Sequence, residues 1–102
     1  MIYVIATIEV KAGKREALLA EFHKNRPNVL AEKGCIEYGP TVDAATDIKA
    51  QIPLRENVAT IVDKWDNLQA LHAHLAAPHM AVYRERVKDF VVGVTLQILD
   101  PK

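Results

Sequence analysis

The chain has few of the features that mark secreted, membrane or nucleic-acid-binding proteins. Its single cysteine cannot form an intrachain disulfide, which is typical of a reducing compartment. Thirteen basic and thirteen acidic residues balance, so no net charge draws the chain to nucleic acid or an anionic membrane. There is no basic and apolar signal segment, and no apolar run of about 20 residues that could span a bilayer. We therefore expect a soluble cytoplasmic protein with neither kind of partner.

Glycine is also scarce, with four residues in 102. No glycine-rich phosphate loop or dinucleotide fingerprint is present, so the sequence gives no support for a tightly bound nucleotide or flavin, and we expect no cofactor. A metal site is not expected either. His72 and His74 are two residues apart on a predicted helix and diverge, and no cysteine or acidic residue completes a zinc spacing.

The hydrophobic periodicity predicts a single α+β domain over residues 1–102 with the order β-α-β-β-α-β, a ferredoxin-like arrangement with an antiparallel sheet. Alternating or β-branched runs predict four strands, at Ile2–Val10, 35–42, Val58–Trp65 and Val91–Leu99. Helical spacing predicts one helix from about Lys14 and another through Leu68, Leu71 and Leu75, with a new helical segment beginning at Pro78.

Prolines and glycines mark the uncertain boundaries. Pro27 predicts that the first helix either ends near Asn25 and restarts or kinks there, carrying Val29 and Leu30 onto the sheet. Gly34 is the expected C-terminal cap of that helix. Pro40 indicates an irregular or edge position for the second strand. Residues 43–57 are polar and mixed, and they form either a loop or a short extra strand at 49–54.

Three of the predicted strands carry apolar residues on both faces, although two helical crossovers cover only one face of a four-stranded sheet. On the last strand, Val92, Val94, Leu96 and Ile98 share one face. A second copy of the same sheet is the simplest cover for the remaining apolar surface. The pattern therefore predicts a twofold homodimer.

Several short motifs resemble those of the antibiotic biosynthesis monooxygenase family of small dimeric α+β barrel proteins. The motifs are Ala12-Gly13-Lys14, Gly34-Cys35-Ile36-Glu37-Tyr38, Asp63-Lys64-Trp65, Ala70-Leu71 followed by His74, and Pro78-His79. The chain departs from the family pattern in two places. The acidic position before the tryptophan, usually Glu, is Asp63, and the segment 43–57 is longer. The resemblance implies a dimeric α/β barrel.

His74 occupies the recurrent histidine position of that family. A neutral imidazole at an apolar pocket accepts a proton from a phenolic substrate, which makes His74 the candidate base, with Asp63 as a second catalytic candidate. The alternative interpretation of His74 is a histidine hydrogen-bonded for packing. His72 lies nearer the Leu68 and Leu75 stripe, and His79 sits at a helix start; both suit structural or exposed roles.

The candidate substrate-binding residues are Trp65, Tyr38, Arg84 and His79. An indole N–H and a phenol hydroxyl position an aromatic ring and its oxygen, and an arginine binds an anion. Three of the catalytic and substrate-binding candidates also have a simpler structural interpretation. Trp65 packs as core at a strand end, Asp63 forms an ion pair with a basic residue, and Arg84 belongs to a solvated helix face.

The resemblance implies an oxidoreductase, a cofactor-independent monooxygenase that uses O₂ on a quinol, anthrone or similar polyphenol. Two alternatives remain open at the sequence level. One is an isomerase of a small phosphorylated carbonyl sugar, with Arg84 as phosphate anchor and acid–base groups among Cys35, Tyr38, Asp63 and His74. The other is a dimer that binds small molecules without turnover.

Overall fold

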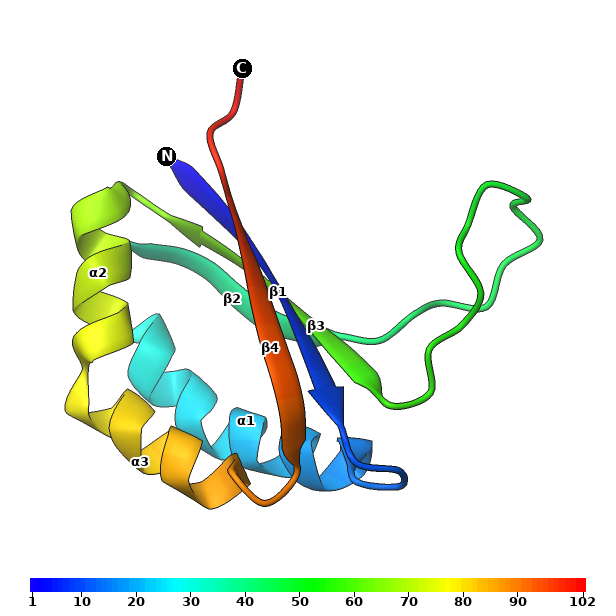
Figure 1. Cartoon of the computed structure of the whole chain (residues 1–102). Helices are drawn as coiled ribbons and strands as arrows, with labels where there is room; N and C mark the ends of the chain where they lie inside the picture. The colour runs from blue at the N-terminus through cyan, green and yellow to red at the C-terminus, as the bar shows by residue number, and fades with distance from the viewer.

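The computed structural model describes all 102 residues and shows a four-stranded antiparallel sheet with three helices on one face (Figure 1). The elements are β1 (Ile2–Val10), α1 (Arg15–Leu30), β2 (Cys35–Thr41), β3 (Val58–Trp65), α2 (Leu68–Ala76), α3 (Pro78–Val87) and β4 (Val91–Leu99). The strand order β2-β3-β1-β4 is ferredoxin-like, which confirms the predicted class. None of the three helices has the length and apolar character needed to cross a membrane.

Helix α1 runs through Pro27 without ending, so the first of the two expected outcomes, an end near Asn25 followed by a restart, does not occur. A proline inside a helix costs one hydrogen bond, but the following turn is kept because Ala31 N–H donates to Pro27 C=O at 3.2 Å. Val29 is fully buried, as expected. Leu30 is 45% exposed, so the expectation that it packs on the sheet is wrong.

The turn from α1 into β2 depends on Gly34. The helix cap is Ala31, in ordinary right-handed geometry, so the expectation that Gly34 caps the helix is wrong. Gly34 instead has φ +86° in the turn, and a Cβ there would lie 2.7 Å from the Ala70 Cβ of α2. Its C=O accepts the Asp66 N–H at 2.9 Å. The glycine lets the turn pass close against the start of α2.

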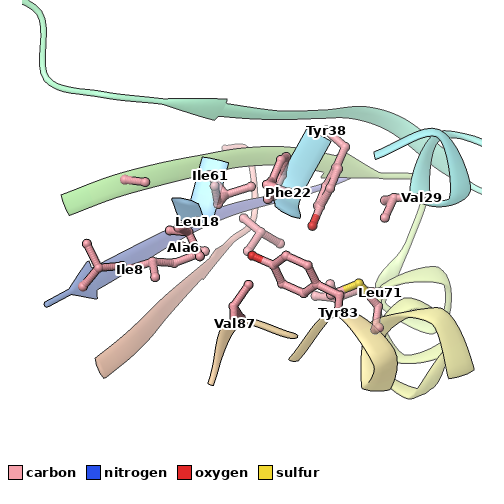
Figure 2. Packing of buried hydrophobic residues seen from close by; sticks show 14 of the residues in the cluster. Ala6, Ile8, Leu18, Phe22, Val29, Tyr38, Ile61, Leu71, Tyr83 and Val87 are labelled. Carbon is pink, nitrogen blue, oxygen red and sulfur yellow. The ribbon is translucent and has the colours of Figure 1, made fainter. Parts of the chain in front are cut away.

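The core lies between the sheet and the helices, and Figure 2 shows its packing. The pairing of β1 with β3 places Val4 opposite Asp63, Ala6 opposite Ile61 and Ile8 opposite Ala59. Paired residues share a face, so this register puts all six toward the helices. The largest fully buried side chains are Trp65, Phe22, Leu18, Leu71 and Val29. Alternation along β3 therefore decides which polar side chain enters the core.

β2 and β4 form the two edges of the sheet. Pro40 lies within β2, and the pairing of β2 with β3 shifts register between Cys35 and Glu37, which confirms the edge and irregular position predicted for it. The segment between β2 and β3 contains no strand and projects from the sheet as a loop (Figure 1). Its base is closed by Arg55, whose backbone and guanidinium nitrogens donate to Asp43 at 2.9 Å.

The apolar face of β4 lies on the helix side of the sheet, but the helices do not cover it. Val94, Leu96 and Ile98 pair with Ile8, Ala6 and Val4, and so share their face. The three β4 side chains are nevertheless 45–54% exposed. One chain alone therefore leaves an apolar strip uncovered along this edge.

The two glycines in left-handed geometry give a matched test of the turn before β2. Gly34→Ala adds both backbone strain and a clash with Ala70, whereas Gly13→Ala (φ +78°) meets no atom within 4 Å. Left-handed strain costs about 1–2 kcal/mol, and forced overpacking adds about 1–3 kcal/mol. Urea unfolding should therefore show a larger loss of unfolding free energy for Gly34→Ala. Equal losses would contradict the close approach of α2.

Candidate active site

A cavity of about 440 Å³ lies between the sheet and the helices. Fourteen of its eighteen lining residues are hydrophobic, so it presents an apolar surface to a ligand. Its ionisable lining residues are Asp63 from β3, His74 from α2, Tyr38 from β2, and Tyr83, Arg84 and Lys88 from α3 and the turn after it. Val94 and Leu96 of β4 form the wall on the uncovered edge.

Asp63 is a carboxyl group inside this apolar wall, only 4% exposed. Its Oδ2 accepts the indole N–H of Trp65 at 2.7 Å, which leaves Oδ1 without a protein partner. Burial raises the pKa of Asp63 to about 6, and the hydrogen bond from Trp65 opposes the rise in part. Asp63 can therefore exchange a proton near neutral pH, unlike an ordinary surface aspartate.

His74 is 3% exposed and is held on three sides. Its Nδ1 lies 2.8 Å from Oε2 of Glu32, and its ring lies 4.6 Å from Trp65 and 5.4 Å from Tyr38, centroid to centroid. An ionised carboxylate only accepts hydrogen bonds, so Nδ1 carries the proton and Nε2 carries the lone pair. Burial lowers the pKa of His74, with Glu32 opposing, so the ring is neutral and Nε2 can accept a proton.

Two tyrosines bring hydroxyl groups to the same interior (Figure 2). Tyr38 stacks on Phe22 with centroids 4.8 Å apart, and Tyr83 meets Phe22 edge-on at 6.1 Å. The Tyr83 hydroxyl is buried and has no hydrogen-bond partner in the chain. Burial raises the pKa of Tyr83 to about 12 and raises that of Tyr38 further, so both remain neutral hydrogen-bond donors.

The structure separates the residues predicted from sequence into two groups. Asp63, His74, Tyr38 and Arg84 line the cavity, and Arg84 also donates to Leu75 C=O at 2.9 Å. Trp65 is fully buried behind Asp63 and His74 and does not line the cavity. His79 also lies outside the lining, with Nε2 3.3 Å from Oε2 of Glu32.

His72 is exposed, which confirms one of the two roles expected for it, but the Leu68 and Leu75 stripe near which it is expected does not pack as a unit. Leu68 is itself 47% exposed. The buried face of α2 consists of Leu71 and His74, three residues apart, with Leu75 beside them. Because this face of α2 points inward, His74 at the recurrent position is buried and His72 is exposed.

Glu32 and Tyr83 extend the site beyond the principal sequence candidates. Glu32 lies in the turn before Gly34, far from His74 in sequence, and no spacing rule links the two. Tyr83 is an alternative to Tyr38 as a hydroxyl donor, but its helical register with Met80 and Val87 also predicts core packing. No group of three or more His, Cys, Asp or Glu side chains is arranged to hold a metal ion.

The ferredoxin-like sheet and the acid–base groups that line an apolar cavity define a small α+β protein with a candidate ligand site. Residues 1–86 match the family described as antibiotic biosynthesis monooxygenase, and the chain belongs to that family. It is 38% identical over 103 residues to a protein of Escherichia coli K12 described as "Probable quinol monooxygenase YgiN", covering 99% of this chain and 98% of that protein. A protein of Shigella flexneri with the same description matches equally well.

Solved structures agree with the fold. A conserved protein from Methanosarcina mazei superposes with a TM-score of 0.83 at 20% identity, covering 99% of this chain and 92% of that one. A structure described as an antibiotic biosynthesis monooxygenase gives a TM-score of 0.80 at 18% identity, covering 100% and 99%. At these identities the likeness establishes the shared fold and nothing finer.

The raised pKa of Asp63 predicts how stability depends on pH. Because the folded-state pKa exceeds the unfolded value of 3.8, unfolding releases a proton between about pH 4 and 6, and stability from this group falls as pH rises through 6. Asp63→Asn keeps an oxygen for the Trp65 N–H but does not titrate. The unfolding free energy of the variant minus that of wild type should therefore increase between pH 4 and pH 7, on the order of 3 kcal/mol.

Urea unfolding at several pH values checks this prediction. The variant-minus-wild-type difference removes the contribution of His74, whose lowered pKa acts in the opposite direction. A difference that does not change with pH would show that Asp63 titrates as an ordinary carboxyl.

Proposed function

We propose that the protein is a cofactor-independent monooxygenase acting on a quinol, anthrone or similar polyphenol. One observation carries the proposal: an apolar cavity holds two bases, Asp63 Oδ1 and His74 Nε2, that have no protein partner. The description of the Escherichia coli relative as a quinol monooxygenase supports the same substrate class. A flat aromatic ring suits the apolar wall, and its hydroxyl suits the bases.

In the proposed reaction the substrate supplies all the electrons. A hydroquinone and O₂ give a hydroxyquinone and water: one oxygen atom enters the ring, the other leaves as water, and the ring loses four electrons. A phenolate gives an electron to O₂ more readily than a phenol, so removing the hydroxyl proton promotes the first step. The protein's task is to exclude water, orient the ring and accept the proton.

The lining residues suit distinct parts of this task. His74 is the proposed base because it is neutral and its Nε2 is free, with Asp63 as a second proton acceptor at higher pH. Tyr38 and Tyr83 are proposed donors to substrate oxygens, and the unpartnered Tyr83 hydroxyl gains its hydrogen bond only from a ligand. Trp65 positions Asp63 through its indole N–H and does not contact the aromatic ring of the substrate.

The isomerase alternative has weaker support from the cavity. Arg84 and Lys88 line it and could hold a phosphate, but the remaining wall is predominantly apolar. A phosphorylated sugar presents hydroxyl groups all round, and an apolar wall would desolvate them without replacing their hydrogen bonds. Competition by a sugar phosphate against aromatic ligands tests this alternative directly.

Oxygen uptake with a panel of hydroquinones, corrected for autoxidation, tests the proposed function. Under ¹⁸O₂ one labelled atom should appear in the product and one in water. Failure of every hydroquinone and anthrone to give oxygen uptake above background would favour binding without turnover.

Removing the proposed base should slow the reaction at neutral pH. General-base assistance is worth about 10²- to 10⁴-fold in rate, so His74→Ala should lose roughly that factor in kcat. The matched control is His72→Ala, which removes an exposed imidazole two residues away on the same helix. Raising the pH should recover part of the loss in His74→Ala by ionising the substrate. Equal losses in both variants would exclude His74 as the base.

We also propose that the protein acts as a homodimer. The support is the apolar surface that one chain leaves open, above all Val94, Leu96 and Ile98 on β4, and the sheet face that no helix covers. Because Val94 and Leu96 also line the cavity, the exposed strip borders the candidate site. A second copy would then shield both the substrate and the apolar side chains of β4 from water.

Sedimentation should give twice the 11.4 kDa chain mass at micromolar concentration. Val94→Asp should weaken the dimer, because burying an unpaired carboxylate costs several kcal/mol. Val82→Asp is the matched control, since Val82 on α3 is 51% exposed and Val94 is 54% exposed. A folded wild-type monomer, or a dimer unaffected by Val94→Asp, would contradict the proposed interface.

A further inference from the structure

Glu32 connects a turn in the first half of the chain to two consecutive helices in the second half. It lies in the turn between α1 and β2, and its side chain is 16% exposed. Its Oε2 lies 2.8 Å from His74 Nδ1 on α2 and 3.3 Å from His79 Nε2 at the start of α3. One carboxylate oxygen therefore meets two imidazoles at the back of the cavity wall, where the cavity lining includes His74 but neither Glu32 nor His79.

We propose that Glu32 is a positioning residue that sets the tautomer and orientation of His74. By accepting the Nδ1 proton, it leaves the Nε2 lone pair as the basic atom of the ring. Trp65 and Tyr38 hold the ring faces, but aromatic contacts do not distinguish Nδ1 from Nε2. Only the carboxylate makes that distinction. Among the polar groups near the ring, Glu32 alone is hydrogen-bonded to it.

Charge gives Glu32 a second effect. When a phenolic O–H gives its proton to Nε2, the bonding electrons stay on the oxygen and His74 becomes a buried imidazolium. His79 and Arg84 oppose that positive charge, whereas the Glu32 carboxylate stabilises it at 2.8 Å. The other ionisable groups that line the cavity are Asp63, Tyr38, Tyr83 and Lys88. The identity of the proton donor rests on the proposed function; the tautomer assignment does not.

The first test uses no substrate. ¹⁵N–¹H correlation spectra of the full-length protein at pH 7.5 report the tautomer of each histidine, with the His74 signals identified by their loss in His74→Gln. Wild type should show a protonated Nδ1 and an unprotonated Nε2. Glu32→Gln should shift the population toward protonated Nε2, because an amide can donate to Nδ1. The control Glu37→Gln, which removes an exposed carboxylate that pairs with Lys64, should leave the spectrum unchanged.

A protonated Nε2 in wild type would overturn the proposal without reference to any variant. So would an unchanged His74 spectrum in Glu32→Gln, once circular dichroism shows that the variant is folded. Retention of the wild-type tautomer in Glu37→Gln and its loss in Glu32→Gln would establish the assignment.

The second test uses the best hydroquinone substrate. Glu32→Gln should lower kcat by at least about tenfold and by no more than the roughly 10²- to 10⁴-fold expected for loss of the base itself, and leave KM within about threefold of wild type. A pH–rate profile separates this role from packing. Glu32 raises the pKa of His74, so loss of the carboxylate shifts the limb assigned to His74 toward lower pH or abolishes it. Equal kcat in Glu32→Gln and Glu37→Gln would overturn the positioning role. Absence of oxygen uptake in wild type with an intact tautomer assignment would instead contradict the proposed function.

Discussion

The register between β1 and β3 is the constraint on which the interior depends. Pairing of Val4 with Asp63 and of Ile2 with Trp65 turns the odd-numbered residues of β3 toward the helices. A shift of one residue would move all of them to the opposite face. The core would lose its largest buried side chain, and the cavity would lose a carboxyl group. Both the packing and the site therefore follow from one strand pairing at the centre of the sheet.

The polar groups in this interior are arranged so that each is partly compensated. Burying a carboxyl group or an imidazole is costly, and each makes one hydrogen bond: Asp63 accepts from Trp65 of the same strand, and His74 donates to Glu32. In each pair one atom, Asp63 Oδ1 or His74 Nε2, has no hydrogen-bond partner in the chain. The same burial raises the pKa of Asp63 to about 6 and lowers that of His74, so Asp63 exchanges a proton near neutral pH while His74 stays neutral. Packing and acid–base character thus have a common cause.

Family membership and function have different kinds of support. The family match and the relative at 38% identity establish the family, and the solved structures establish the fold. One fold hosts many chemistries, so the reaction must be argued from the cavity and its side chains. Here the apolar wall, the free base atoms and the unpartnered Tyr83 hydroxyl favour an aromatic substrate with oxygen functions. Val94 and Leu96 of β4 line the cavity and are about half exposed, so a single chain does not close it.

Local patterns in the sequence determined the strands, the order of elements and the edge position of β2 through Pro40, whereas the choice of His74 and Asp63 rested on the resemblance to the family. They did so because alternation, helical spacing and proline chemistry act over a few residues. Tertiary structure alone decided that α1 continues through Pro27, that Gly34 serves the approach of α2, and that His72 faces outward while Trp65 supports Asp63 from behind. It also brought Glu32 to His74 across 42 residues. These outcomes depend on which segments meet in space, and packing between distant elements leaves no periodic signal along the chain.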